Sequence, residues 1–366
     1  MGDDSVRCVE QVDAAWLTGV LRETRTVPDD VSIEVVRAVP IGTGQVGDNV
    51  RFELVWSRDD PALPPSVVGK FPSRSEVSRA TAVQVGTYVR EVGFYRDLQS
   101  RVDICTPVVH HVGWDPVTHD FVIVMGDLRE SHPGDQLAGC DVGEAELVVA
   151  EVVGLHAPTW GRVEALRGLD WLGHPGADRA ATLAMMYAAT LPGFVDRYGG
   201  RLGREVVTIA ERVVGASERL SALTAEWAEG RGAWCVAHGD FRLDNILFGD
   251  AAGEPPVTVV DWQTVTIGTG IADVAYFVGS GLRPDVRATH ERRLVERYVA
   301  AMRRAGVELD DELAWDGYVL GSAGGLLMAV VASQIVEQTE RGDEMFMTMA
   351  ARHAVQIDAV GLLGRL

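Results

Sequence analysis

Apolar and polar residues alternate in the first third of the chain. Residues 50–56 place a large apolar side chain at every second position, and residues 32–41 form a similar stretch just before them. Because successive side chains of a strand point to opposite faces, this pattern predicts two strands. The apolar runs at 67–71 and 121–125 predict two more. The first third of the chain is therefore expected to hold a β-sheet.

Apolar residues at helical spacing predict helices both between these strands and in the remainder of the chain. Residues 6–25 are expected to form a short amphipathic helix and residues 76–99 a longer one. Asp141 followed by Glu144 forms a capping box, which predicts a helix from there to His156. His156 precedes a proline and is expected to stabilise this helix end rather than perform chemistry.

The change from strands to helices divides the chain into two parts. Residues 1–125 are expected to form a β-rich lobe with one main helix, and residues 126–366 a larger, mostly α-helical lobe. A chain of 366 residues, of which 47% are hydrophobic, is long enough for one large domain or two packed ones with a substantial core. The predicted fold class is therefore α+β.

The chain is acidic, with a formal net charge of −20 and a pI of about 4.8. This charge argues against a nucleic-acid partner and weakly favours a cationic small molecule. No apolar run approaches the roughly 18 residues of a membrane span, and the start of the chain has no apolar signal core. The four cysteines are scattered without CxxC pairs, which indicates reduced thiols. We expect a cytoplasmic protein without a membrane partner.

One polar stretch, residues 238–245, concentrates the candidate chemistry. It reads His-Gly-Asp-Phe-Arg-Leu-Asp-Asn, and two short apolar runs separated by a turn-rich segment follow it. The runs predict a β-hairpin, whose outer ends would place Asn245 beside Asp261, with Asp240 one loop away. Three oxygen-bearing side chains would then converge, which suits Mg²⁺ and a phosphoryl group between the metal and an acceptor hydroxyl.

The spacing from Asp240 to Asn245 matches the kinase catalytic loop. In that loop an Asp accepts the proton of the substrate hydroxyl, an Asn five residues later holds Mg²⁺, and a further Asp holds it as well. Asp261 stands at the last of these positions, after the predicted hairpin. The alternative is a polar turn before a buried hairpin, in which Asp240 and Asp244 are local caps.

A glycine-rich segment and a single lysine suggest how a nucleotide would bind. Gly42, Gly44 and Gly47 make a GxGxxG pattern between two predicted strands. This context fits a flap over ATP phosphates, and an ordinary glycine-rich hairpin fits it as well. Of the 33 basic residues only Lys70 is a lysine, which points to a role that arginine cannot fill.

Glu91 lies near the apolar face of the helix predicted over residues 76–99. A carboxylate in that position needs a partner, and Lys70 at the end of a predicted strand is the obvious one. In kinases such a strand Lys, paired with a helix Glu, positions the phosphates of ATP. The alternative is a surface pair of Glu91 with Arg90 or Arg96.

The residues of these motifs resemble those of the aminoglycoside phosphotransferase superfamily, which shares the protein-kinase-like fold and phosphorylates small molecules. His-Gly-Asp at 238–240 has Gly where protein kinases have Arg, and Asp-Trp-Gln at 261–263 lacks their Phe-Gly. The stretches 42–45 and 90–95 look most like the ecdysteroid-kinase-like, or choline-kinase-like, branch. The resemblance covers nearly the whole chain.

This resemblance implies a two-lobed protein-kinase-like fold with ATP and Mg²⁺ as cofactors. It implies that Asp240 is the catalytic base and that Asn245 and Asp261 bind Mg²⁺. Lys70, with Glu91, would bind the phosphates of ATP. The other implied cofactor-binding positions lie in the glycine loop and in the segment that would hold adenine; they are Gly42, Gly44, Gly47, Met125, Gly126 and Leu128.

We therefore expect an ATP-dependent O-phosphotransferase that acts on a hydroxyl of a small molecule. A natural product, a sugar, an amino alcohol and an aminoglycoside-like antibiotic all remain open as the acceptor. The aromatic residues between 160 and 230 are expected either to cap the acceptor pocket or to pack in the core. Asp273 is expected either to anchor the catalytic loop or to cap its own helix. The alternative from another class is a nucleotide-binding pseudokinase that acts as a partner module.

Overall fold

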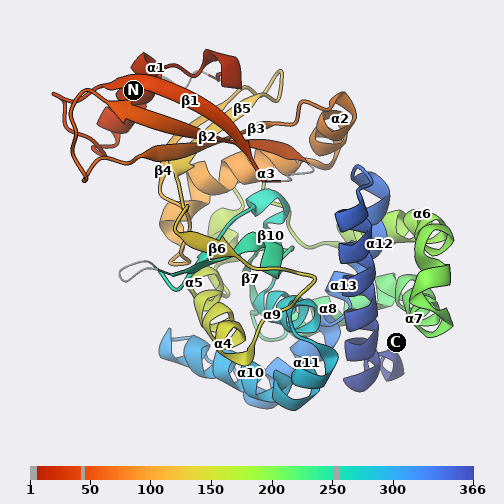
Figure 1. The fold of residues 1–366 in the computed structure, drawn as a ribbon. Helices are drawn as coiled ribbons and strands as arrows, with labels where there is room; N and C mark the ends of the chain where they lie inside the picture. Colours follow the sequence, from red (N-terminus) through yellow and green to blue (C-terminus); the bar gives the residue numbers. More distant parts are fainter. Residues whose placement is uncertain (1–5, 43–45, 251–254) are drawn as a thin grey trace. The chain divides into compact units, whose positions relative to one another are not determined.

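The computed structural model describes residues 6–42, 46–250 and 255–366. The chain forms two compact units, which we call the N-terminal unit and the C-terminal unit (Figure 1). Their boundaries are Met1–Ser100 with Thr106–Glu130 for the N-terminal unit, and Arg101–Cys105 with Ser131–Leu366 for the C-terminal unit.

The N-terminal unit is built on one antiparallel sheet with the spatial order β1-β2-β3-β5-β4. Strand β3 is buried except at its last residue, which explains its continuous apolar run. Lys70 on β3 pairs with Asn49 on one side and with Ile123 on the other. The five strands are β1 (Ile33–Ile41), β2 (Gly47–Trp56), β3 (Ser66–Pro72), β4 (Val109–Trp114) and β5 (Phe121–Gly126).

One hydrophobic cluster joins this sheet to helix α1 (Ala14–Glu23). The helix contributes Leu17 and Leu21, the sheet contributes Phe52 and Val67, and all four side chains are fully buried. Burying each such side chain stabilises the fold by roughly 1.5–3 kcal/mol. The cluster therefore holds α1 on the sheet.

Helix α1 is shorter than the helix predicted over residues 6–25. It starts at Ala14 because Asp13 caps it, accepting a hydrogen bond from the amide of Trp16 at 2.8 Å. Upstream of the cap, Val9–Gln11 form a separate 3₁₀ turn, η1. The apolar spacing extended across both elements and did not show the break.

The helix predicted over residues 76–99 is also divided. Helix α2 (Glu76–Val85) ends at Gly86, whose φ of 73° is left-handed, and helix α3 (Thr87–Gly93) starts directly after it. Glycine adopts this conformation without the steric cost that other residues have, so it ends helices readily. Two short turns then follow, the π-helical η2 (Phe94–Leu98) and the 3₁₀ turn η3 (Gln99–Arg101).

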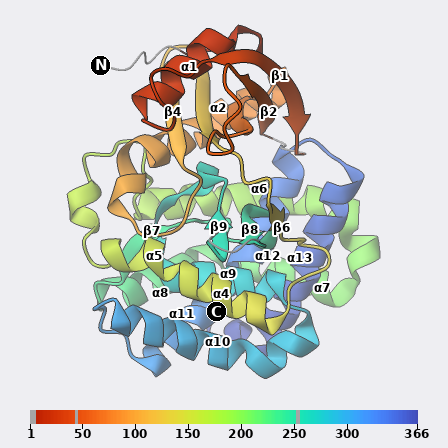
Figure 2. The same cartoon turned by 60° about the vertical axis from the view of Figure 1, so that its left-hand side comes forward.

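The C-terminal unit is mostly helical (Figure 2). Its helices are α4 (Val142–Glu151), α5 (Val153–His156), α6 (Ala177–Leu202), α7 (Arg204–Gly215), α8 (Ser217–Glu229), α9 (Gly270–Gly281), α10 (Pro284–Arg304), α11 (Asp311–Gly321), α12 (Gly324–Ile335) and α13 (Glu340–Ala359). Short 3₁₀ turns connect them and the strands; these are η4 (Ala157–Thr159), η5 (Val163–Leu166), η6 (Leu243–Asn245), η7 (Trp262–Thr264) and η8 (Leu362–Gly364).

Two small sheets of this unit flank the polar stretch 238–245. One has the order β10-β7 and the other β6-β8-β9. Strand β8 pairs antiparallel with β9, so the predicted hairpin is confirmed. The strands are β6 (Ser131–Pro133), β7 (Trp234–Ala237), β8 (Ile246–Gly249), β9 (Val257–Val259) and β10 (Thr266–Thr269).

The capping box predicted at the start of α4 is confirmed. Asp141 accepts a hydrogen bond from the amide of Glu144 at 2.9 Å, and the Glu144 carboxylate accepts one from the Asp141 amide at 2.9 Å. The helical run reaches His156 as predicted, with one interruption at Val152 between α4 and α5.

Helix α9 passes through the core of the C-terminal unit, and all of its residues except Ala272 are buried. A helix that is apolar on all sides is typical of a protein core. Residues 311–335, which contain α11 and α12, are long and apolar enough to cross a membrane by composition, but 67% of their most apolar window is buried in the protein. They are therefore also typical of core helices.

The segment Arg101–Cys105 belongs to the C-terminal unit, although residues of the N-terminal unit precede and follow it in the sequence. The Asp103 amide donates a hydrogen bond to the carbonyl oxygen of Gly154 at 2.8 Å. A Cβ at Gly154 would lie 2.7 Å from the amide nitrogen of Ile104, so only glycine permits this close approach.

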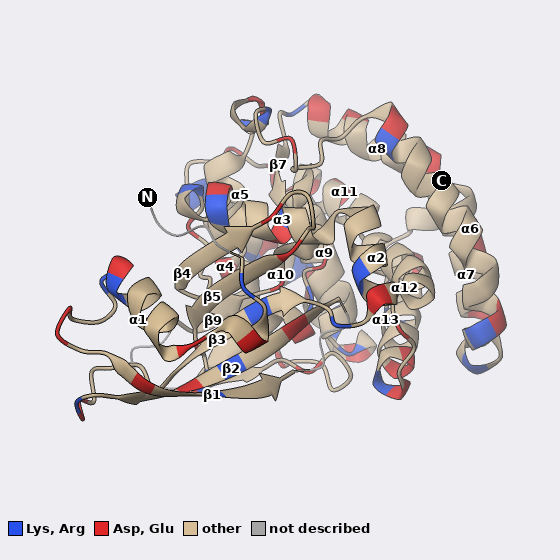
Figure 3. Ribbon diagram, turned by 90° about the horizontal axis from the view of Figure 1, so that it is seen from above, with Lys and Arg blue, Asp and Glu red and all other residues tan. Residues whose placement is uncertain are grey.

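Charged positions are distributed over both units. In the view of Figure 3, acidic and basic residues are interspersed along the helices and strands. The net charge of −20 is therefore not gathered on one element. Together, a β-sheet N-terminal unit and a larger helical C-terminal unit confirm the predicted α+β fold class.

Candidate active site

Strand β7 leads directly into the polar stretch that holds Asp240. Gly239 has a φ of 81°, and a Cβ there would lie 2.7 Å from the carbonyl oxygen of Thr264. Both observations require glycine at this position. Thr264 in turn donates its hydroxyl to the carbonyl oxygen of His238 at 2.8 Å. The backbone before Asp240 is thus tightly held.

Asp273 of α9 anchors the backbone of this loop by hydrogen bonds. Its carboxylate accepts hydrogen bonds from the amides of His238 at 2.7 Å and Gly239 at 3.0 Å. The cap position of α9 is Thr269, so the first of the two expectations for Asp273 is the one that the structure shows. His156 contacts the Asp273 carboxylate through Nε2 at 3.2 Å, so it supports the anchor besides ending a helix.

Asp240 lies among three hydrogen-bond donors. Tyr276 donates its hydroxyl to Oδ1 at 2.7 Å, Arg242 Nε lies 3.0 Å from Oδ2, and Asn245 Nδ2 lies 3.1 Å from Oδ2. Burial disfavours the charged carboxylate, but the Arg242 charge and the Tyr276 hydroxyl outweigh burial and lower the pKa of Asp240. Asp240 is therefore ionised at neutral pH and can accept a proton.

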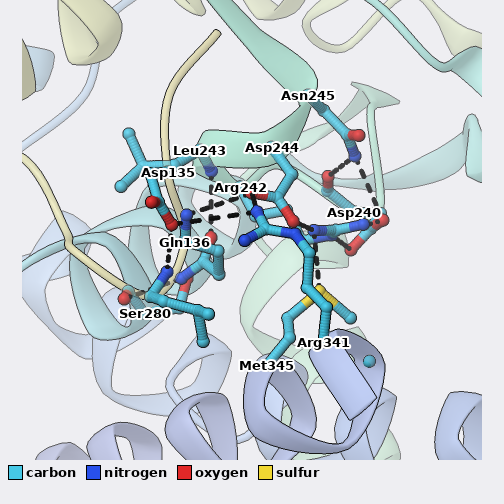
Figure 4. Close-up of polar contacts among 12 residues, drawn as sticks. Asp135, Gln136, Asp240, Arg242, Leu243, Asp244, Asn245, Ser280, Arg341 and Met345 are labelled. Carbon is cyan, nitrogen blue, oxygen red and sulfur yellow. Dashed lines mark hydrogen bonds and ion pairs between the residues drawn. The ribbon is translucent and has the colours of Figure 1, made fainter. Parts of the chain in front are cut away.

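Arg242 links Asp240 to a wider polar network, drawn in Figure 4. Its Nη1 contacts Asp244 at 2.8 Å and the sulfur of Met345 at 3.2 Å. The neighbouring carboxylates raise the pKa of Arg242 against the effect of burial, so it stays cationic. Arg341 of α13 contacts Asp244 at 3.2 Å. Asp244 thus bonds to one arginine of its own loop and to one of a distant helix, which the local-cap interpretation did not include.

Asn245 and Asp261 stand at the two outer ends of the β8-β9 hairpin. The amide of Val260 donates to the carbonyl oxygen of Asn245 at 3.0 Å, which brings the two ends together as predicted. Asn245 uses its Nδ2 on the Asp240 backbone at 2.8 Å, so its side-chain oxygen is the atom suited to a cation. Asp261 has a φ of 67°, a left-handed conformation that is costly for a residue other than glycine.

An amide oxygen and a carboxylate at one hairpin end are ligands that Mg²⁺ accepts, so the residues fit this ion. Within the described ranges, no group of three or more His, Cys, Asp and Glu side chains forms a metal site. A hard cation held by two protein groups and by nucleotide phosphates does not need such a group. The metal roles of Asn245 and Asp261 stay predictions.

In the N-terminal unit, Lys70 and Glu91 form a buried ion pair. Lys70 Nζ lies 2.5 Å from Glu91 Oε1, and the two residues are 7% and 1% exposed. This is the ion pair that the sequence analysis favoured over a surface pair of Glu91 with a neighbouring arginine. Arg90 donates to the carbonyl oxygen of Val85, and Arg96 pairs with its neighbour Asp97.

The glycine loop is described in part. Gly42 has a left-handed φ of 73° and Gly47 starts β2, whereas Gly44 lies outside the described residues. The Tyr88 hydroxyl of α3 donates to the carbonyl oxygen of Val46 at 2.7 Å, which ties the end of this loop to the helix that carries Glu91. The nucleotide role of the loop stays a prediction.

Met125 and Gly126 end strand β5, and Leu128 follows two residues later. The Gly126 amide donates to the carbonyl oxygen of Val108, the residue before β4, at 2.8 Å, so this amide already has a partner in the protein. Asp127 accepts hydrogen bonds from Arg51 and Ser66, both at 2.6 Å, which fixes the segment. The adenine-binding role of this segment also stays a prediction.

The predicted site residues therefore form two groups. Asp240, Asn245 and Asp261 come together in the C-terminal unit, while Lys70 and Glu91 come together in the N-terminal unit.

The sequence analysis missed two side chains that hold Asp240 in place, Arg242 and Tyr276. Arg242 stands inside the motif, two positions after Asp240, and was detectable there. Tyr276 is a tyrosine in an apolar helix, where no pattern distinguishes it.

Comparisons with known proteins agree with this arrangement. A family model described as "Phosphotransferase enzyme family" matches residues 191–307, about a third of the chain, including all three predicted catalytic and metal positions. Over 41 residues the chain is 49% identical to acyl-CoA dehydrogenase family member 10 of Mus musculus. That match covers 11% of this chain and 4% of the mouse protein, so it spans only a small part of that relative.

Solved structures match over nearly the whole chain. The GDP complex of wild-type aminoglycoside 2'-phosphotransferase-IIIa has a TM-score of 0.53 at 13% identity, covering 94% of this chain and 99% of that one. The GDP complex of a mutant of that enzyme gives 0.54 at 13% identity, covering 95% and 100%. A candidate aminoglycoside phosphotransferase from Ralstonia eutropha gives 0.50 at 15% identity, covering 95% and 97%.

These matches have two consequences. The family match favours a phosphotransferase without naming its substrate, and the ecdysteroid-kinase-like branch stays a prediction. The structural matches confirm the fold predicted from the motifs: the chain has the α+β, protein-kinase-like fold of the aminoglycoside phosphotransferases.

Proposed function

We propose that the protein is a phosphotransferase that moves the γ-phosphate of ATP to a hydroxyl of a small molecule. The observation that carries this proposal is the environment of Asp240. Arg242 and Tyr276 hold its carboxylate ionised and oriented on a loop anchored by Asp273. A general base needs this combination of a fixed position and an available charge.

In the proposed reaction, Asp240 accepts the proton of the acceptor hydroxyl while that oxygen attacks the γ-phosphorus. One oxygen–phosphorus bond forms, the bond between the γ-phosphorus and the bridging oxygen breaks, and ADP leaves. Tyr276 and Arg242 keep the Asp240 carboxylate in the geometry for this transfer. Positioning of this kind supplies much of the rate in phosphoryl transfer.

Asn245 and Asp261 would hold Mg²⁺, which neutralises charge on the phosphates when bound. Lys70, oriented by its ion pair with Glu91, would bind phosphate oxygens of the nucleotide. A compact ammonium suits this role because it contacts several oxygens without the planar bulk of a guanidinium. The glycine loop would cover the phosphates, and the segment from Met125 to Leu128 would hold the adenine ring of the nucleotide.

ATP and GTP are both candidate phosphate donors, because the structural neighbours include complexes with GDP. ATP and GTP should both be offered to the purified protein, with Mg²⁺ and a library of alcohols, sugars, amino alcohols and aminoglycosides. We expect nucleoside diphosphate release that depends on an acceptor, with a phosphorylated product seen by mass spectrometry. The Asp240→Asn protein is the control and should bind nucleotide without transferring phosphate.

The pseudokinase alternative predicts a different result in this experiment. A pseudokinase would bind nucleotide but release no diphosphate with any acceptor. The intact set of Asp240, Asn245 and Asp261 argues against it, because a module that only binds a nucleotide has no use for a fixed base. Nucleotide binding without acceptor-dependent turnover across the library would reject the proposed function.

A further inference from the structure

The first turn of helix α6 holds an arginine that is not ion-paired with any carboxylate of the described residues. Arg179 stands in the first turn of α6, and it forms no ion pair or hydrogen bond with any residue in the described ranges. The chain has 53 acidic residues against 33 basic ones, so carboxylates are available to pair with arginines. None of those in the described ranges is placed against this guanidinium.

The Arg179 side chain is not simply in solvent. It packs against Gly173, where a Cβ would collide with Nη1 of Arg179 and lie 3.1 Å from the Thr266 hydroxyl oxygen. Burial lowers the pKa of Arg179, and the phenol of Tyr187 opposes this only in part. A partly buried charge without a protein partner is unfavourable, and an anionic ligand would relieve this cost.

Arg352 shows what a structural arginine looks like in the same unit. Burial lowers its pKa as well. Its guanidinium, however, donates to the carbonyl oxygens of Gln136 at 3.0 Å, Ser280 at 2.7 Å and Leu137 at 2.8 Å. These hydrogen bonds replace the ones that the buried guanidinium would otherwise make with water. The described residues give Arg179 no such set of acceptors, so packing alone does not explain its position.

Helix stability does not explain Arg179 either. The first turn of a helix carries the positive end of the helix dipole, which favours acidic residues and disfavours a cation. Gly176, at the N-cap of α6, makes no side-chain cap bond. Asp178 in the same turn favours the helix, but it forms no ion pair with Arg179. The arginine itself therefore adds nothing to helix stability at this position unless an anion approaches it.

The position of Arg179 relates it to the catalytic loop within the C-terminal unit. Gly173, against which it packs, accepts hydrogen bonds from the Thr266 hydroxyl and the Ile267 amide, both at 2.9 Å. Thr266 on β10 pairs with Ala237 on β7, and Asp240 lies three residues beyond Ala237. Arg179 thus stands one strand away from the segment that carries the proposed base.

We propose that Arg179 determines acceptor specificity by binding a carboxylate of the acceptor, so that the substrate class is hydroxylated carboxylic acids. This proposal rests on the proposed phosphotransferase function and names the substrate class of that same site. A guanidinium binds a carboxylate through two parallel hydrogen bonds, and this geometry favours acids over neutral or cationic acceptors. The local cation opposes the weak preference for cationic acceptors that the net charge of −20 suggested.

The test uses matched acceptors that differ only in the anion. Glycolate, lactate, malate and mandelate are compared with their methyl esters, and with ethanolamine and choline, in binding by calorimetry and in phosphate transfer with ATP and Mg²⁺. We expect the acids to be bound and used at least about 10-fold better than their esters. Arg179→Gln should lower kcat/KM for the acids by about 10- to 100-fold, and leave the esters and ATP binding unchanged.

A matched control is Arg204→Gln, because Arg204 opens helix α7 but is exposed. It should leave the acid preference as it is. The specificity proposal is overturned if the wild type binds none of the acids, prefers the esters or amines, or keeps its acid preference in Arg179→Gln. Acid binding that depends on Arg179, without phosphate transfer to any acceptor, would instead support the site and reject the proposed function.

Discussion

The hydroxyl of Tyr276 lies 2.7 Å from Oδ1 of Asp240 and donates a hydrogen bond to it. Tyr276 is 3% exposed on the core helix α9, and burial followed by the Asp240 charge raises its pKa well above the ordinary value of a tyrosine. The hydroxyl therefore stays protonated and acts only as a donor towards this carboxylate. A core helix thus reaches the proposed base directly and fixes its orientation.

Removing this contact should slow the reaction without unfolding the protein. Tyr276→Phe keeps the ring and its packing but removes the shorter of the two hydrogen bonds to Oδ1 of Asp240, which keeps only that from Arg242 Nε at 3.2 Å. We expect kcat to fall by roughly 10- to 100-fold, because misplacing a reacting group by about 1 Å has an effect of that order. The melting temperature should change by only a few degrees.

Tyr318→Phe is the matched control for that experiment. Tyr318 is a buried tyrosine of α11 that bonds to Glu291 at 3.1 Å and to Gln356 at 2.8 Å, and the proposed base is not among its partners. It should reduce stability and leave kcat unchanged. Equal kcat values for the two variants would contradict a positioning role of Tyr276.

Asp240→Asn should abolish most turnover while nucleotide binding persists. The amide has the same shape as the carboxylate but cannot accept the acceptor proton, and losing a general base typically costs about 10²–10⁴-fold in rate. Single-turnover transfer and nucleotide affinity should be measured together. Retention of wild-type transfer would remove Asp240 from the mechanism.

Asp261→Asn tests the metal assignment. Asn tolerates the left-handed backbone that Asp261 adopts, so the change removes the charge without adding strain. We expect the Mg²⁺ concentration for half-maximal activity to rise by about 10-fold or more, because one hard anionic ligand is lost. Asp285→Asn, at an exposed position of α10, should leave the Mg²⁺ titration unchanged. A wild-type Mg²⁺ dependence in Asp261→Asn would show that this residue is not a ligand.

Lys70→Arg should keep the fold and lose most catalysis. The pair with Glu91 is short and buried, so a planar guanidinium would displace either the carboxylate or the phosphates. We expect kcat/KM for ATP to fall by roughly 100-fold. Glu91→Ala acts through the same pair, so the double variant should be less impaired than the product of the single effects. Arg37→Lys, on the exposed side of β1, is the control.

His353 should make the folded state sensitive to mild acid. It is fully buried in α13, where Nδ1 contacts Gln356 Oε1 at 2.9 Å and the Ser322 carbonyl oxygen at 3.2 Å. Burial lowers its pKa to about 4. The unfolded chain binds this proton with a pKa near 6.5, so stability is full above that value and declines as the pH falls towards 4.

The size of this effect can be measured by urea unfolding. Between pH 7.5 and pH 5 the free energy of unfolding should fall by roughly 2 kcal/mol through this one group. His353→Gln should remove that part of the pH dependence, whatever it does to absolute stability. An unchanged slope in His353→Gln would assign the acid sensitivity to other groups.

Much of the fold was predictable from local patterns. The alternation over 50–56 predicted β2, the capping box at Asp141 predicted the start of α4, and the two apolar runs after residue 245 predicted the β8-β9 hairpin. These predictions hold because each depends on side chains close in sequence. The same locality explains the errors, since one left-handed residue at Gly86 divides a helix without changing its apolar spacing.

The sequence by itself determined which residues carry the candidate chemistry, because Asp240, Asn245 and Asp261 lie within one loop and one hairpin. Only the tertiary structure decided how those residues are held. Tyr276 reaches Asp240 from 36 positions away. Arg179 packs against Gly173, and no carboxylate in the part of the chain that the structure describes pairs with it. Contacts between distant elements depend on how helices and strands pack, and the periodicity of apolar residues determines which faces are buried but not which polar groups meet there.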